Sequence, residues 1–214
     1  MSISRSHAQA LALVAPVVAA VRREHLGRPT PCAGWDLRRL LEHLIGQQYG
    51  FAAAARGDGE RPGVFADRPL PDAPGVAFTA LAGFADSAAE LVESFEAAET
   101  TGRAFALPEI RRGVDFPATH AIGFHLLDTL VHGWDLAVTL DLPFDCPPEL
   151  ARPLLRVAQQ VPADPATRAP GRSFAPVLPE AGTAGTAEAT EIPDAAGPFE
   201  QALRLLGRDP AWRA

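Results

Sequence analysis

The chain has 214 residues, of which 47% are hydrophobic and 21% charged, so we expect one globular domain with an extension, or two small units. The net charge is −7 and no basic stripe runs along the chain, which disfavours nucleic-acid binding. No apolar stretch reaches membrane-spanning length, no secretory leader is indicated, and Cys32 and Cys146 lie outside any CxxC context, so we expect a cytoplasmic protein with free thiols.

The first half of the chain reads as helical. Hydrophobic periodicity predicts helices over residues 4–26, 37–56 and 76–98. Pro16 predicts a kink or break within the first helix, because proline removes one helical hydrogen bond. The segment TPCAGWD, residues 30–36, predicts a turn that ends in Asp36, a suitable N-cap for the second helix. Residues 57–74 are rich in Gly, Pro and Asp and predict a loop before the third helix.

The second half is helical with longer irregular segments. Within residues 100–117, we expect a short antiparallel pair between residues 104–107 and 114–116. Further helices are predicted over residues 120–140, 148–161 and 199–206, with a Pro-, Gly- and Ala-rich connection over residues 163–198. We therefore expect an all-α fold, with a four-helix bundle over residues 1–161 and a partly irregular C-terminal extension over residues 162–214 whose short helix docks on the bundle.

The predicted fourth helix carries an unusual polar side. At about 100° per residue, His125, Asp128 and His132 fall within roughly 60° of one another. Acid and imidazole four residues apart on a helix can reach one point in space, and His43 lies on the second helix. Two imidazoles and a carboxylate from two helices, with one position left open, are typical of a catalytic divalent-metal site. Zn²⁺ suits these ligands best, and Ni²⁺, Fe²⁺ or Co²⁺ also bind imidazole.

Other interpretations of these residues stay open at this stage. His43 could be a structural histidine, and Asp128 with His132 could form only a local hydrogen bond. His125 could be a metal ligand, a hydrogen-bond donor behind the ligands, or a packed imidazole. We expect the remaining histidines at the surface or at helix ends: His7, His25 and His120. The rings of Trp35 and Trp134 fit the core better than a substrate platform.

Two segments resemble a known family. TPCAGWDLRRLLEHLIG (residues 30–46) and GFHLLDTLVHGWDLA (residues 123–137) are similar to the two signature motifs of the mycothiol-dependent maleylpyruvate isomerase N-terminal-domain family, within the DinB-like superfamily. FAPVLPE (residues 174–180) and LLGRDPAW (residues 205–212) resemble tails of an uncharacterised metal-binding branch of that superfamily. The resemblance covers most of the chain and implies a DinB-like four-helix bundle.

The resemblance also implies a site. A divalent metal would be held by His43, Asp128 and His132, and the isomerase-like members carry Glu where this chain has Asp128. His125 lies outside this three-ligand pattern. The family implies thiol chemistry, in which mycothiol or another small bacterial thiol attacks a small electrophile. Maleylpyruvate itself is not supported as the substrate, because that enzyme's full C-terminal domain has no counterpart in the tail after residue 161.

These observations give a first hypothesis and three alternatives. The first is a thiol-dependent transferase or isomerase in which the metal activates a thiolate, with Gln47, Tyr49 and Phe51 expected to line the pocket near His43. The alternatives are a metal-dependent hydrolase that uses water, a non-catalytic metal-binding module, and a helical domain without a metal. A homodimer formed through an outer helix face is compatible with all four.

Overall fold

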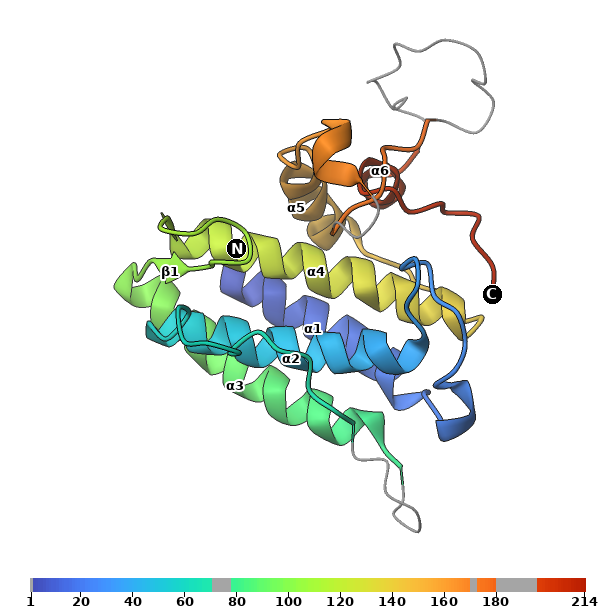
Figure 1. Ribbon diagram of the computed structural model, residues 1–214, viewed down its shortest axis with the longest axis horizontal. Coiled ribbons are helices and arrows are strands. Elements are labelled where there is room, and N and C mark those ends of the chain that lie inside the picture. The colour runs from blue at the N-terminus through green and yellow to red at the C-terminus, as the bar shows by residue number, and fades with distance from the viewer. Residues whose placement is uncertain (1, 71–77, 170–172, 180–195) are drawn as a thin grey trace. The chain divides into compact units, whose positions relative to one another are not determined.

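A computed structural model describes residues 2–70, 78–169, 173–179 and 196–214 (Figure 1). The predicted start of the third helix at residue 76, and parts of the predicted connection over residues 163–198, lie outside these residues. The chain divides into two compact units, residues 1–144 and residues 145–213.

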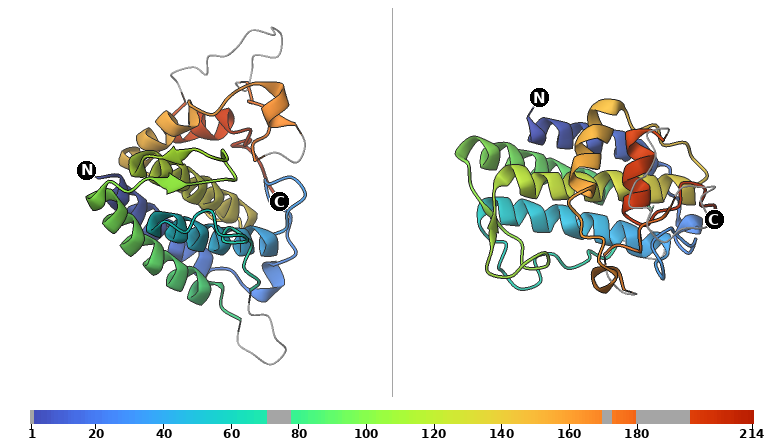
Figure 2. Two further views of the ribbon diagram at one scale, coloured as in Figure 1. Left: turned by 60° about the vertical axis from the view of Figure 1, so that its left-hand side comes forward. Right: turned by 90° about the horizontal axis from the view of Figure 1, so that it is seen from above.

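The first unit is a bundle of four helices: α1 (Ile3–Ala19), α2 (Leu37–Arg56), α3 (Ala80–Thr101) and α4 (Ala118–Thr139). They lie side by side in Figure 1 and Figure 2, where α1 packs on α3 and α4, and α2 packs on α3 and α4. This arrangement confirms the predicted all-α four-helix bundle. In the part of the chain that the structure describes, no helix is both long and apolar enough to cross a membrane.

The core of the bundle is built from large aliphatic and phenylalanine side chains that are completely or almost completely buried. The largest of them are Leu37, Leu40, Leu41, Leu44, Phe84, Leu91, Phe95, Phe105, Leu107, Ile122, Leu126 and Leu130. Each contributes roughly 1.5–3 kcal/mol relative to an exposed position. Members of this set come from α2, α3 and α4. Their packing holds α2 and α4, the two helices that carry the candidate ligands, next to each other.

The first helix is shorter than predicted. α1 begins after Ser2, whose side chain caps it, and ends at Ala19, while residues 23–25 form a separate 3₁₀ turn, η1 (Arg23–His25). The predicted continuous helix over residues 4–26 is therefore wrong at its C-terminal end. Pro16 lies inside α1, and the helix ends within one turn of it, which is consistent with the hydrogen bond that proline removes.

The second helix has the predicted bounds and caps. The side chain of Asp36 accepts a hydrogen bond from the backbone N–H of Arg39 at 2.9 Å. The helix ends at Gly57, whose φ of +99° lies in the left-handed region that favours glycine. These caps fix the position of His43, two turns into the helix.

A short hairpin connects α3 to α4. β1 (Phe105–Ala106) pairs antiparallel with β2 (Asp115–Phe116), and Phe105 lies opposite Phe116. The predicted pairing between residues 104–107 and 114–116 is confirmed, although each strand has only two residues.

The second unit contains α5 (Pro148–Ala158), η2 (Pro165–Arg168) and α6 (Pro198–Leu205). α5 packs on α6, which is why the division between the units falls at residues 144 and 145 and not at the expected residues 161 and 162. The buried guanidinium of Arg168 donates hydrogen bonds to the carbonyl oxygens of Pro162, Ala175 and Leu205. One side chain thus joins three segments of this unit.

Candidate metal centre

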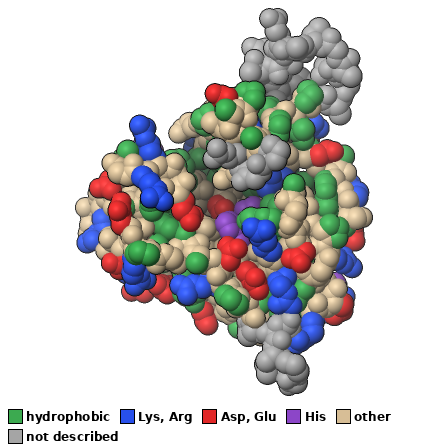
Figure 3. Space-filling view, viewed as in Figure 1, with side chains coloured by type: hydrophobic (Ala, Val, Ile, Leu, Met, Phe, Trp, Pro, Cys, Tyr) green, Lys and Arg blue, Asp and Glu red, His purple; other side chains and the backbone are tan. Residues whose placement is uncertain are grey.

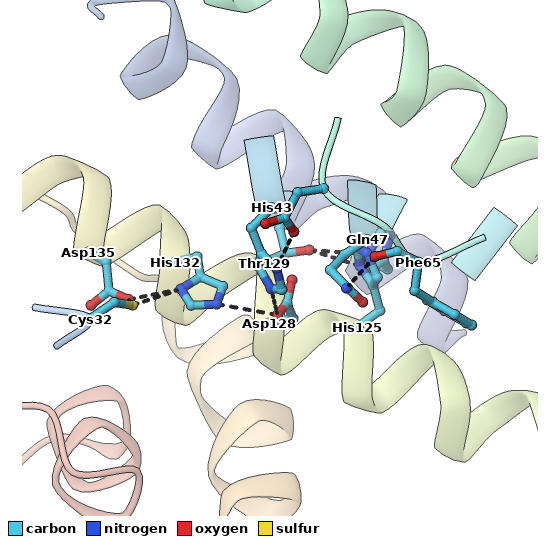
Figure 4. Close-up of polar contacts among 11 residues, drawn as sticks. Cys32, His43, Gln47, Phe65, His125, Asp128, Thr129, His132 and Asp135 are labelled. Atoms are coloured by element: carbon cyan, nitrogen blue, oxygen red, sulfur yellow. Dashed lines mark hydrogen bonds and ion pairs between the residues drawn. The ribbon is translucent and has the colours of Figure 1, made fainter. Parts of the chain in front are cut away.

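The two candidate ligands on α4 lie one helical turn apart on the same face. Nε2 of His132 is 3.4 Å from Oδ1 of Asp128, and Nε2 of His43 on α2 is 3.9 Å from the same oxygen (Figure 4). One ligand atom from each of the three residues lies within 4.8 Å of the others. The predicted convergence of His43, Asp128 and His132 is therefore present in the fold.

These distances and partners fit a divalent cation. Two ligand atoms bound tetrahedrally to Zn²⁺ at about 2.0–2.1 Å are about 3.4 Å apart, close to the separations seen here. Oδ2 of Asp128 is buried and has no hydrogen-bond partner among the described residues. A buried carboxylate oxygen without a partner is costly, and a cation at this point would satisfy it. Two neutral imidazoles and a carboxylate are also ligands that Zn²⁺ accepts.

The charges at this centre are strongly coupled. Burial by itself would raise the pKa of Asp128, but the charge of His132 and the hydrogen bond and charge of His43 outweigh it and hold that pKa well below its usual range. Burial would likewise lower the pKa of His132, but Asp128, and then Cys32 and Asp135, raise it well above its ordinary value. A cation arriving at Nε2 of His132 therefore competes with a proton.

A second carboxylate fixes the ring of His43. Nδ1 of His43 is 3.2 Å from Oδ1 of Asp67, which leaves Nε2 facing Asp128. The loop that carries Asp67 can lie against α2 because of two glycines on that helix: a Cβ at Gly46 would lie 2.5 Å from the carbonyl oxygen of Ala66, and one at Gly50 would collide with the ring of Phe65. Sequence reasoning missed Asp67, which lies in a predicted loop.

A third carboxylate and a thiol lie behind His132. Nδ1 of His132 is 2.9 Å from Oδ2 of the fully buried Asp135, and Sγ of Cys32 is 3.2 Å from the same oxygen. Sequence reasoning missed both residues. The signal for Asp135 is its position three residues after His132, which places the two side chains on one helix face. Cys32 carries no comparable signal, because the segment that contains it is irregular.

Trp35 flanks both ligand histidines. Its ring centroid is 4.8 Å from that of His43, edge to face, and 6.3 Å from that of His132, nearly parallel. Trp35 is partly buried and packs against the hydrophobic core, as expected, and its ring at the same time covers one side of the two histidines. Histidine and acidic side chains reach the surface together in Figure 3.

His125 does not join the cluster, so its inclusion among the metal ligands has no support in the geometry. Its Nδ1 is 2.8 Å from Nε2 of His7 and 3.1 Å from Oγ1 of Thr129, and both histidines are completely buried. Its ring packs edge to face against Phe51, with the centroids 4.6 Å apart. His125 lies nearly one turn before Asp128, where the helix face turns into the core. The expectation that His7 lies at the surface or at a helix end is wrong, because His7 is completely buried within α1.

The three residues predicted to line a pocket lie in different surroundings. Gln47 is buried and donates a hydrogen bond from Nε2 to the carbonyl oxygen of Phe65 at 3.3 Å. Tyr49 is partly buried beneath the guanidinium of Arg68, 5.3 Å from its ring centroid. Phe51 packs in the core against Phe65 and His125. Their role in ligand binding stays a prediction.

A surface depression of about 780 Å³ lies beside the cluster in the first unit. It is lined by Gly27, Pro29, Thr30, Gly34, Trp35, Asp36, Arg38, Arg39, Glu42 and Asp67. Trp35 and Asp67 both contact the ring of His43, so the depression adjoins the centre through that histidine. None of Gln47, Tyr49 and Phe51 lines it.

Comparison with known proteins decides the family. A family model, the mycothiol maleylpyruvate isomerase N-terminal domain, matches residues 7–137, which span all four bundle helices and the three clustered ligands. This chain belongs to that family. Two uncharacterized proteins of Mycobacterium tuberculosis, from strains CDC 1551 / Oshkosh and H37Rv, are each 30% identical to it over 203 residues, covering 95% of this chain and 96% of each relative.

A solved structure shares the fold. The crystal structure of the mycothiol-dependent maleylpyruvate isomerase matches with a TM-score of 0.53 and 15% identity, over 74% of this chain and 68% of that chain. The sequence resemblance to this family and the predicted DinB-like fold are thereby confirmed. At this identity the match concerns the fold alone.

Proposed function

We propose that this chain binds a divalent cation through His43, Asp128 and His132 and uses a small thiol of the mycothiol class in a transferase or isomerase reaction. The observation that carries the proposal is the convergence of three ligand atoms from two helices beside a buried carboxylate oxygen that has no partner among the described residues. Membership of a family named for a mycothiol-linked isomerase supports the thiol. Zn²⁺ fits the donor set best, and Ni²⁺, Fe²⁺ and Co²⁺ are alternatives.

Each polar group of the centre has a role in this proposal. A bound Zn²⁺ supplies the Lewis acidity that favours the thiolate form of a thiol at neutral pH. Asp128 balances the charge of the cation, while Asp67 holds the ring of His43 so that Nε2 faces inward. Trp35 covers one side and excludes water there.

The neighbouring depression is a suitable place for the small-molecule partners. Its lining combines acidic side chains with two arginines, and the guanidinium of Arg39 lies 4.6 Å from the ring centroid of Trp35. A guanidinium near an aromatic face recognises a carboxylate while the ring contacts apolar atoms. We therefore propose that the electrophile carries a carboxylate.

Metal analysis and thiol assays test the proposal. The purified chain should contain one divalent cation, and His43→Ala should remove it. The wild-type chain should consume mycothiol together with carboxylate-bearing electrophiles, and a chelator should stop the reaction. Asp86→Asn, on the exposed surface of α3, is a matched control that should change neither result. A wild-type chain without a bound cation overturns the site, and turnover of a substrate with water in the absence of thiol would favour a hydrolase.

A further inference from the structure

His132 has a different partner at each ring nitrogen. Nε2 faces Asp128 at 3.4 Å, and Nδ1 faces Asp135 at 2.9 Å. A neutral imidazole carries one proton, so only the nitrogen without it can offer a lone pair to a cation. A group that accepts a hydrogen bond from one ring nitrogen keeps the proton on that nitrogen. The other nitrogen then carries the lone pair that can bind the metal.

We propose that Asp135 is a positioning residue that keeps the proton of His132 on Nδ1 and so directs the lone pair of Nε2 toward Asp128 and His43. This inference rests on the metal-binding part of the proposed function. Asp135 suits the role because its side chain is completely buried, where a charge-assisted hydrogen bond is strong. Its place three residues after His132 on α4 fixes the direction of approach.

Cys32 completes the arrangement from another part of the chain. Its Sγ lies 3.2 Å from Oδ2 of Asp135, within the range in which a thiol donates to a carboxylate. The backbone N–H of Cys32 donates to Oγ1 of Thr30, and the backbone N–H of Trp35 donates to the carbonyl oxygen of Cys32. These bonds hold the turn before α2 in one conformation, with Sγ behind the ring of His132.

The two sequence motifs thus contribute to one centre. The motif before and within α2 supplies a ligand, His43, and also the thiol and the indole that contact His132. The motif on α4 supplies Asp128 and His132, and also Asp135, three residues after His132, whose carboxylate orients the ring. Each motif thus fixes side chains of the other, so neither alone makes a centre.

Cys32, His132 and Asp135 are also candidates for binding a metal themselves, which differs from the positioning role proposed for Asp135. Sγ of Cys32, Nδ1 of His132 and Oδ2 of Asp135 also lie within 4.8 Å of one another and are themselves metal-ligand types. A cation held there would take the lone pair of Nδ1 and require a proton on Nε2, or a ring without any proton. The two uses make opposite demands on His132, so they predict different spectra.

Cobalt binding to the full chain distinguishes them. Wild type should bind one Co²⁺ without a thiolate-to-cobalt charge-transfer band, and competition with a chelator should show an affinity about 10–100-fold lower for Asp135→Asn. Cys32→Ser, which keeps a donor, should bind within about threefold of wild type, and Cys32→Ala more weakly than Cys32→Ser. Asp86→Asn is the matched control for the Asp-to-Asn change. An unchanged affinity in Asp135→Asn, a charge-transfer band lost in Cys32→Ser, or two Co²⁺ per chain would overturn the proposal.

A second measurement does not need a metal. Nitrogen chemical shifts of the ring in the metal-free chain, at a pH where His132 is neutral, should show the proton on Nδ1, and Asp135→Asn should move it at least partly to Nε2. A proton on Nε2 in wild type overturns the positioning role. If wild type binds no Co²⁺ while the proton lies on Nδ1, the metal-binding function fails and the role of Asp135 in fixing the ring survives. Thermal unfolding of each variant verifies that it is folded.

Discussion

The bundle contains two pairs of neighbouring histidines, and α4 contributes one member to each. His43 and His132 stand 5.5 Å apart, ring centroid to ring centroid, and each has carboxylates close to its ring nitrogens. His7 and His125 stand 4.9 Å apart and are surrounded by Phe51, Phe95 and the hydroxyl of Thr129.

The surroundings of each pair set the direction in which the pKa values of its histidines shift. Burial lowers the pKa of His7 well below its ordinary value and that of His125 to about 4, and the charge of Asp128 offsets this lowering only in part. At His132 nearby Asp128 reverses the direction. A histidine pair without close acids is a neutral core element, and a pair with acids is a place for a cation.

The strongest test of this difference removes the carboxylate from the metal centre. Asp128→Asn should lower Co²⁺ affinity by more than about 100-fold, because it removes a ligand and not merely a group behind one. Asp128→Glu should retain binding, since the longer acid keeps the same ligand chemistry. Competition titration against a chelator measures both variants. Equal binding by Asp128→Asn and wild type would show that the two histidine pairs do not differ as argued.

A mutation in the buried pair, His7 and His125, should lower the stability of the fold and leave cobalt binding nearly unchanged. His125→Ala should reduce the free energy of unfolding by about 3 kcal/mol, because it opens a cavity between packed aromatic rings. The same variant should keep Co²⁺ affinity within about threefold of wild type, since His125 lies outside the ligand cluster. Urea denaturation and cobalt titration give the two values. A large loss of cobalt affinity in a folded His125→Ala would restore His125 as a metal ligand.

Stability should also depend on pH through the buried pair. The unfolded chain binds protons at its histidines near pH 6.5, whereas folded His125 resists protonation until about pH 4. The unfolded state therefore binds more protons between these values, so stability is complete above about pH 6.5 and falls as the pH drops toward 4, by on the order of 3 kcal/mol. His132, whose folded pKa is raised, adds a stabilisation that is already complete below pH 6.5 and is lost only at higher pH.

Denaturation of the metal-free chain at a series of pH values measures this slope. His125→Gln, which cannot take up a proton, should flatten the pH dependence between pH 4 and 6.5. An equal slope in wild type and His125→Gln would assign the acid sensitivity to other groups.

The two pairs also show how far the sequence alone could lead. Helical periodicity and caps predicted the bounds of α2 and the approximate bounds of α4, because both depend on neighbouring residues. The same local regularity revealed Asp128 and His132, four residues apart, as one side of a site. His43 was identified from its place at the edge of the apolar face of its helix and from the resemblance of the surrounding motif to the family.

The missed residues depend on long-range packing. Asp67 reaches His43 because Gly46 and Gly50 let a loop lie on α2, and no periodicity encodes that approach. His7 meets His125 across 118 positions of sequence, so its burial follows only from how α1 packs on α4. His125 was assigned to the metal because its helical angle was close to that of Asp128, and that angle does not say where the bundle core begins.

The smallest expected effect compares the two carboxylates that contact Nδ1 atoms at the centre. The side chain of Asp67 is 43% exposed and lies 3.2 Å from His43, whereas Asp135 is completely buried and lies 2.9 Å from His132. Water and dissolved ions weaken the exposed contact, so Asp67→Asn should lower Co²⁺ affinity only about threefold, against 10–100-fold for Asp135→Asn. Raising the salt concentration should shrink the Asp67 effect and leave the Asp135 effect nearly unchanged. Equal losses in both variants would mean that burial does not govern how strongly a carboxylate orients a ligand histidine in this bundle.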